Sequence, residues 1–214
     1  MKGLWSRRNN TYHGKEFQHP TALHQQAKTD LAVYQEAITE DRAVKFNACA
    51  GVPKWKKPEV GSLKVNWDAA VNLEEGRIGI GVLIRDHDGL VMGSLRASRN
   101  LKGTPFDAEA YGLLLAVVFC KEIGLTHVCL EGDSKQVVDL LQNCARNWSL
   151  GGCLVEDARE ILNSYAVWSV THVYREANMA SHLLANNALE ATEDTYDLET
   201  CPSCIFPIVS KEML

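Results

Sequence analysis

The spacing of apolar and polar residues predicts a block of strands and helices in the middle of the chain. Apolar and polar residues alternate over 63–71, and a second alternation covers 78–84, as is typical of half-buried strands. Asp88 and Gly89 form a dipeptide that favours a tight hairpin turn. Residues 90–98 are therefore predicted to be the return strand of a three-stranded antiparallel meander.

Helical signals dominate the following part of the chain. Thr104 suits an N-cap and Pro105 a first helical position, so an apolar helix is predicted from there to about Ile123, with Gly124 ending it. Five further elements are predicted: a strand at 127–131, helices at 134–142 and 154–164, a strand at 167–174 and a helix at 177–190. Over residues 61–190 this order predicts an α/β fold with a five-stranded mixed sheet, in which an antiparallel three-strand meander continues into parallel strands and helices cover both faces.

Two extensions are predicted to flank this domain. Residues 1–60 are polar apart from a helical pattern over 21–41, and we interpret them as an N-terminal extension with one helix and a linker. Residues 191–214 are acidic and aperiodic, which predicts a disordered tail. Cys201 and Cys204 in that tail have C-x-x-C spacing but lack a second ligand pair, so we interpret them as incidental cysteines rather than a zinc site.

The composition is that of a water-soluble globular protein. The 214 residues are 46% hydrophobic and 23% charged, and the seven cysteines are too irregular for a disulfide framework. The longest apolar run, 113–120, is too short to span a bilayer, and the first ten residues lack the apolar core of a secretory signal. We therefore expect an intracellular protein, nuclear or cytoplasmic, with no membrane partner.

The net charge bears on nucleic-acid binding. With 22 basic and 27 acidic residues the chain carries −5, which counts mildly against tight binding of nucleic acid without metal. It does not count against a nuclease whose carboxylates are offset by divalent ions. Lys54, Lys56 and Lys57 surround Trp55, and we interpret this short basic run as a solvated linker, with phosphate contact as the alternative.

Three carboxylates lie where predicted strands and helices meet. Asp68 is in the middle of the first strand, where aspartate is disfavoured, while Glu109 is in the first turn of the long helix and Asp133 closes the fourth strand. If the first and fourth strands are neighbours, the three converge, and such a cluster must be offset by metal. Hard oxygen ligands suit Mg²⁺ or Mn²⁺, and two such ions can activate water and stabilise the leaving oxygen of a phosphodiester.

Several motifs occur together in a characteristic order. They are Lys64–Ala70 (KVNWDAA), Gly79–Asp86 (GIGVLIRD), Ala108–Ala110 (AEA), Glu131–Ser134 (EGDS) and His172–Asn178 (HVYREAN). In order and spacing they resemble the RNase H type 1 domain of plant non-LTR retrotransposon, reverse-transcriptase-like proteins. The resemblance covers residues 61–189, and residues 4–9 are similar to the segment that precedes that domain.

The resemblance implies a metal-dependent endoribonuclease that cleaves the RNA strand of RNA–DNA hybrids. It implies that Asp68, Glu109 and Asp133 hold two Mg²⁺ or Mn²⁺ ions, with Asp68 bridging them. His172 falls on the family's loop histidine, which aids product release; a strand-end histidine bonded to backbone is the alternative. His182 falls on the family's fourth carboxylate, and imidazole is a poor ligand for Mg²⁺.

Two kinds of function therefore remain open. The first is a hybrid ribonuclease that is slow because its fourth carboxylate is replaced by His182. The second is a catalytically impaired nucleic-acid-binding or protein-interaction module derived from a retroelement. The oligomeric state is not indicated by the sequence.

Overall fold

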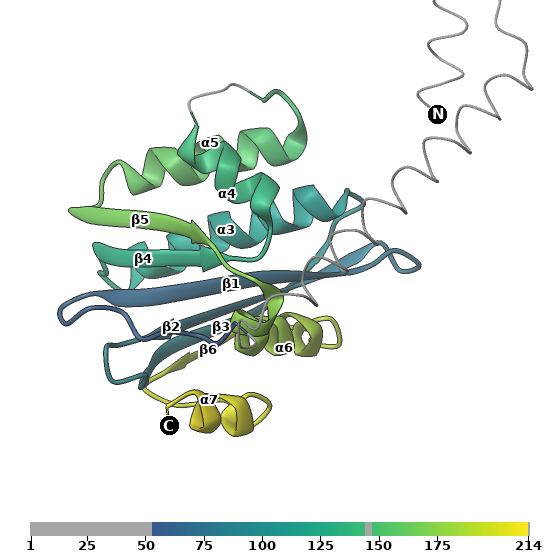
Figure 1. Ribbon diagram of the computed structural model, residues 1–214. Helices are drawn as coiled ribbons and strands as arrows, with labels where there is room; N and C mark the ends of the chain where they lie inside the picture. The colour runs from purple at the N-terminus through teal and green to yellow at the C-terminus, as the bar shows by residue number, and fades with distance from the viewer. Residues whose placement is uncertain (1–52, 144–146, 214) are drawn as a thin grey trace, which may run out of the picture. The chain divides into compact units, whose positions relative to one another are not determined.

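The computed structural model describes residues 53–143 and 147–213, which belong to one compact unit (Figure 1). The elements are β1 (Leu63–Asn72), β2 (Arg77–Arg85), β3 (Val91–Asn100), α3 (Pro105–Glu122), β4 (His127–Gly132), α4 (Lys135–Gln142), α5 (Leu150–Leu162), β5 (Val167–His172), the short 3₁₀ helix η1 (Arg175–Ala177), α6 (Met179–Ala188), β6 (Thr195–Leu198) and α7 (Phe206–Glu212). The helix predicted over 21–41 lies outside the described residues. Among the described helices, none has the length and apolar character needed to cross a membrane.

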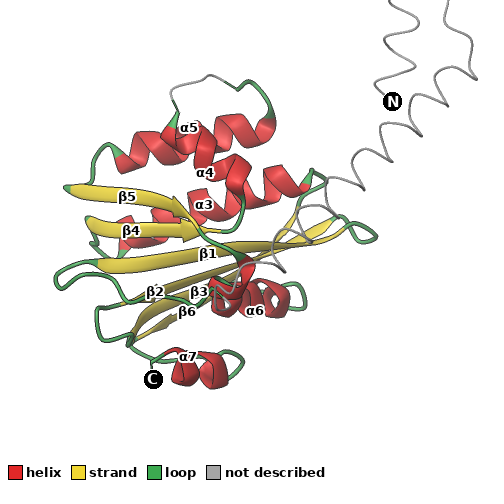
Figure 2. Cartoon of the chain, viewed as in Figure 1, coloured by secondary structure: helices red, strands yellow, loops and turns green. Residues whose placement is uncertain are grey.

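One mixed sheet organises this part of the chain, with the strand order β5-β4-β1-β2-β3-β6 (Figure 2). β1, β2 and β3 form the predicted antiparallel meander, while β4 pairs parallel with β1 and β5 pairs parallel with β4. The mixed α/β fold is therefore confirmed. Trp67 of β1 pairs with Gly132 of β4, so Asp68 and Asp133 follow at neighbouring positions.

The sheet has six strands rather than the expected five, because the segment predicted to be a disordered tail is ordered. β6 pairs antiparallel with β3, and α7 follows it. Two of the acidic residues that suggested disorder form ion pairs with arginines on β3. Arg96 lies 3.3 Å from Asp197, and Arg99 lies 2.6 Å from Asp194. Sequence reasoning was wrong here because those arginines are about a hundred residues away along the chain.

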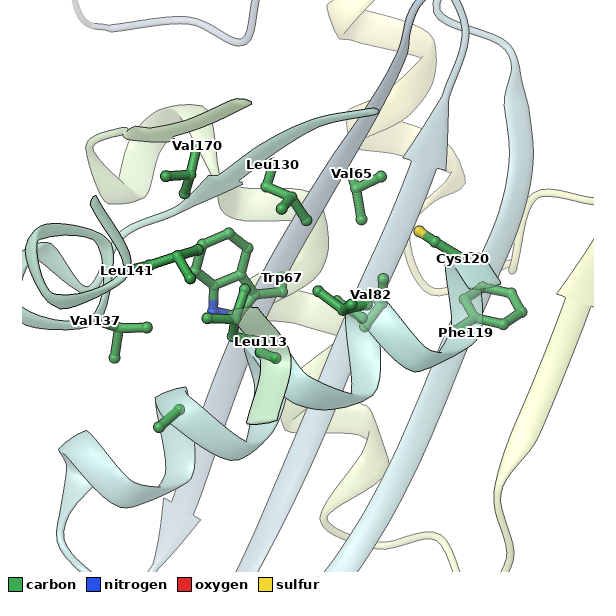
Figure 3. Packing of buried hydrophobic residues seen from close by; sticks show 14 of the residues in the cluster. Val65, Trp67, Val82, Leu113, Phe119, Cys120, Leu130, Val137, Leu141 and Val170 are labelled. Carbon is green, nitrogen blue, oxygen red and sulfur yellow. The ribbon is translucent and has the colours of Figure 1, made fainter. Parts of the chain in front are cut away.

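The apolar face of the sheet packs against α3 and α4, and α5 packs on these two helices; Figure 3 shows the buried side chains between the sheet and the helices. Trp67 is fully buried there, and a Cβ atom at Gly132 would lie 2.4 Å from its indole ring. The start of α3 is set as predicted, because Thr104 at the N-cap and Asp107 at N3 form a capping box on either side of Pro105. The Asp107 carboxylate also accepts a hydrogen bond from the Gly151 amide at 2.8 Å, which ties α3 to α5.

Helix α6 lies on the opposite face of the sheet, in backbone contact with β2. A Cβ atom at Gly79 would lie 2.2 Å from the Ala185 carbonyl oxygen, and one at Gly81 would lie 2.3 Å from that of Ser181. Any side chain at either glycine would push the helix away. The pair of glycines therefore sets how closely α6 approaches the central strands.

The segment before β1, expected to be a linker, also packs on this face. Trp55 is only 5% exposed, and its indole N–H donates to the Asn66 side-chain oxygen at 3.1 Å. The Arg85 guanidinium lies 3.5 Å from the centre of the Trp55 ring, a cation–π contact. Arg85 is itself buried and forms an ion pair with Glu212 of α7. The segments on either side of the expected domain are thus joined to it.

Candidate active site

The three carboxylates predicted from sequence converge in the structure. One oxygen from each of Asp68, Glu109 and Asp133 lies within 4.8 Å of the others. Asp68 is on the central strand β1 and is 1% exposed, and Asp133 follows the last residue of the neighbouring β4. The predicted convergence is therefore confirmed, and it follows from the parallel pairing of β1 with β4.

Glu109 reaches the cluster from the second turn of α3. Its Oε1 accepts a hydrogen bond from the Ala69 amide at 3.3 Å, which holds the side chain against β1. Its Oε2 is buried and has no hydrogen-bond partner among the described residues. A buried carboxylate oxygen without a partner is costly, so this atom calls for a ligand that the chain does not supply.

The electrostatics of the cluster are those of crowded anions. Burial, followed by the negative charges of Glu109 and Asp133, raises the pKa of Asp68 to about 9. Burial and the charge of Asp133 raise the pKa of Glu109 to about 8, although the bond from Ala69 opposes this. Without a cation the two carboxyls hold protons that ordinary carboxyls would have lost.

These residues fit a hard divalent cation. The donors are carboxylate oxygens, the type that Mg²⁺ and Mn²⁺ prefer. The buried Oε2 of Glu109 lacks a partner among the described residues. Burial and then the neighbouring negative charges raise the carboxyl pKa values, and a bound cation would offset both effects. Asp68, Glu109 and Asp133 are therefore the residues that would hold such an ion.

His182 lies beside the cluster, as its position in the sequence predicted. Its Nδ1 is 2.8 Å from Oδ2 of Asp68 and 2.9 Å from Nη2 of Arg175. Burial and then the Arg175 charge lower the pKa of His182, against an opposing effect of Asp133. A neutral imidazole ring therefore occupies the position to which the resemblance assigns the family's fourth carboxylate.

His172 is placed at the edge of the site by a backbone contact. It ends β5, opposite Gly132 of β4, and its Nε2 lies 3.1 Å from the carbonyl oxygen of Asp133. Because a carbonyl only accepts hydrogen bonds, this nitrogen carries the proton in that contact. This contact matches the alternative given above, a histidine at the end of a strand that is bonded to backbone. A role of the ring in product release stays a prediction.

Two residues near the site were missed by sequence reasoning. Arg175 provides a positive charge that partly opposes the rise in the pKa values of Asp68 and Glu109. Asn178 is buried and donates to the Trp67 carbonyl oxygen at 2.8 Å, which connects the start of α6 to β1. Both lie in the motif at 172–178, and an asparagine at the start of a predicted helix was the signal available for Asn178, although its side chain makes no cap hydrogen bond.

Solved structures with this architecture include two type 1 RNases H. The enzyme of the archaeon Halobacterium salinarum is 27% identical, with a TM-score of 0.56, and the match covers 61% of this chain and 98% of that one. LC11-RNase H1 from compost, solved in complex with an RNA/DNA hybrid, is 21% identical, with a TM-score of 0.54 and coverages of 60% and 96%. The fold is that of a ribonuclease H-like domain.

The sequence gives the more specific assignment. Residues 66–188 match the pattern of the reverse transcriptase-like family, so the chain belongs to that family. A curated Arabidopsis thaliana protein that is named as a ribonuclease H protein is 28% identical over 190 residues, or 85% of this chain. The chain spans only 30% of the length of that relative.

Proposed function

We propose that this protein is a metal-dependent endoribonuclease that cleaves the RNA strand of RNA–DNA hybrids. The observation that carries the proposal is the convergence of Asp68, Glu109 and Asp133 within 4.8 Å on a ribonuclease H-like fold. The partner is an RNA–DNA hybrid, the ligand bound in the LC11-RNase H1 structure. The 2′-hydroxyl group would distinguish the RNA strand from the DNA strand.

Each residue of the site has a part in this proposal. Asp68, Glu109 and Asp133 would hold two Mg²⁺ or Mn²⁺ ions through their carboxylate oxygens. Bound divalent ions lower the pKa of water and stabilise charge on phosphate oxygens. Arg175 adds an exposed guanidinium beside the carboxylates, where it can attract a phosphate group. His172 presents a ring held by the Asp133 carbonyl.

The proposed activity is slow, and the reason is His182. Its neutral ring contributes one nitrogen and no negative charge next to Asp68. The metal ions would therefore be bound by three carboxylates instead of four. Mn²⁺ tolerates imidazole better than Mg²⁺ does. We therefore propose that Mn²⁺ supports faster cleavage than Mg²⁺.

The testing experiment is cleavage of an end-labelled RNA–DNA hybrid with each metal, beside Asp68→Asn as the inactive control. The proposal expects metal-dependent products with 3′-hydroxyl and 5′-phosphate ends from the parent protein and none from the variant. Equal cleavage by both proteins would indicate a contaminating nuclease. Absence of cleavage under all metal conditions would refute the enzymatic proposal.

A nucleic-acid-binding module without catalysis is the second candidate, and the placement of His182 favours it. A neutral imidazole next to Asp68 brings less negative charge to the site than a carboxylate would, so the site binds cations less strongly. The Arg175 guanidinium beside His182 adds positive charge that can attract a phosphate group. This candidate predicts salt-dependent binding of hybrid without cleavage. A protein-interaction role predicts neither binding nor cleavage of the hybrid.

A further inference from the structure

Three exposed lysines lie on a segment that the domain holds in place. Lys54, Lys56 and Lys57 are exposed, whereas Trp55 between them is buried against Asn66 and Arg85. The backbone carbonyl of Lys56 also accepts a hydrogen bond from the Lys64 ammonium on β1. We call residues 54–57 the lysine segment. Its backbone is already ordered, so a ligand would not have to order it.

The lysine segment gathers three unpaired positive charges, whereas Lys102, Lys121 and Lys211 are exposed lysines that stand singly along the chain. Six other basic residues of the described chain form ion pairs with carboxylates: Lys64, Arg85, Arg96, Arg99, Lys135 and Arg159. In the part of the chain that the structure describes, no ion pair or hydrogen bond is made by the side chains of Lys54, Lys56 or Lys57. Three ammonium groups within four residues thus remain available to an anion.

Trp55 of the lysine segment and the Asp68 carboxylate lie on the same face of the sheet. Asn66, which accepts the Trp55 hydrogen bond, and Asp68 are two residues apart on β1, so their side chains point to one side. Lys64 and Asp68 are four positions apart on β1, which corresponds to roughly 13 Å of strand. At about 3.4 Å of helix axis per nucleotide, that distance equals about four nucleotides of one strand.

We infer that the lysine segment binds the phosphate backbone of the nucleic acid about four nucleotides from the position of cleavage. The inference rests on the proposed function, because it takes the carboxylate cluster to be the place where the hybrid is cut. It also explains how a chain of net charge −5 can bind a polyanion, since the positive charge is local. Phosphate contacts of this kind position the ligand and carry no sequence preference.

The test measures binding separately from cleavage. In the Asp68→Asn background, fluorescence anisotropy follows the affinity for an RNA–DNA hybrid over a series of salt concentrations. The test variant is K56Q/K57Q, and the matched control is K102Q/K121Q, which removes two exposed lysines elsewhere on the domain. Unchanged melting temperatures verify that both variants fold. K56R/K57R tests whether positive charge is sufficient.

The expected result is a loss of affinity in K56Q/K57Q of at least about tenfold at 50 mM salt. The slope of the logarithm of the binding constant against the logarithm of the salt concentration should also be shallower, by roughly 0.9 for each phosphate that the variant no longer neutralises. K56R/K57R should bind like the parent, and K102Q/K121Q should lose less than about twofold. If K56Q/K57Q matches its control while the parent protein cleaves hybrid, only the present inference is overturned. If the parent neither binds nor cleaves hybrid, the proposed function fails as well.

Discussion

Nδ1 of His182 lies 2.8 Å from Oδ2 of Asp68, so α6 carries residue 182 directly to the carboxylate on the central strand. The same carboxylate is crowded by Glu109 and Asp133, and a neutral imidazole adds no negative charge to the group. Position 182 is therefore where the cluster lacks an anion. The first prediction concerns that position.

Replacement of His182 by aspartate should raise Mg²⁺-dependent cleavage of a hybrid. The new carboxylate supplies a hard anionic ligand, and we expect at least roughly tenfold faster cleavage, or about 1.4 kcal/mol of barrier. Initial rates at fixed Mg²⁺ measure the effect. Asn186→Asp is the matched control, because Asn186 contacts His182 at 3.0 Å and gains the same charge one turn along α6. Equal rates in H182D and N186D would contradict the prediction.

Divalent ions should stabilise the fold through the carboxylate cluster. Because the unfolded chain has no assembled site, Mg²⁺ or Mn²⁺ at millimolar concentration should raise the melting temperature by mass action. Asp68→Asn should weaken this rise. Asp88→Asn should not, although Asp86, His87 and Asp88 form a second, exposed group of potential ligands. A melting temperature that metal leaves unchanged in the parent protein would count against a working site.

In EDTA the stability of the protein should fall as the pH rises from about 5 to about 8. The pKa values of Asp68 and Glu109 are raised to about 9 and about 8 in the folded state, so between their unfolded and folded values the native protein binds more protons. Unfolding then releases protons, and each one lowers stability by about 1.4 kcal/mol per pH unit.

Chemical denaturation at several pH values measures this slope. Glu109→Gln removes one of the two titrating groups and should make the slope shallower. Addition of Mg²⁺ should also flatten it, because the cation displaces the protons. A stability that is flat or rises over this pH range in EDTA would show that the carboxyls are ionised in the metal-free protein.

The ion pair between Arg85 and Glu212 should make the C-terminal helix necessary for stability. Arg85 is 1% exposed, so Glu212→Ala would leave a buried charge without its partner and should cost about 3–5 kcal/mol of unfolding free energy. Urea denaturation measures the loss. Glu193→Ala, at an exposed position, is the control. A cost below about 1 kcal/mol would mean that the guanidinium is solvated after the change.

Local signals were sufficient to predict the centre of the fold. Alternation identified β1 and β2, and Thr104 with Pro105 located the start of α3, because strand pleats and helix caps depend on residues close in sequence. The carboxylate cluster could be inferred because Asp68 is out of place in an alternating strand. That single anomaly was the strongest clue to the site.

The missed features depend on partners far away in sequence. β6 is four residues long and acidic, and it is stabilised by arginines on β3. Trp55 packs on Asn66 and Arg85, which no local pattern reveals. Arg175 is an exposed arginine in a short 3₁₀ helix, and its place beside His182 and the carboxylates depends on how α6 and β1 pack.

The backbone contact between α6 and β2 has a consequence for redesign of the site. Gly79 and Gly81 set the distance of the helix from the sheet, and residue 182 takes no part in that contact. The side chain at position 182 is partly exposed, so it can be exchanged while the helix keeps its place. The domain is thus a scaffold on which the residue facing Asp68 can be varied by itself.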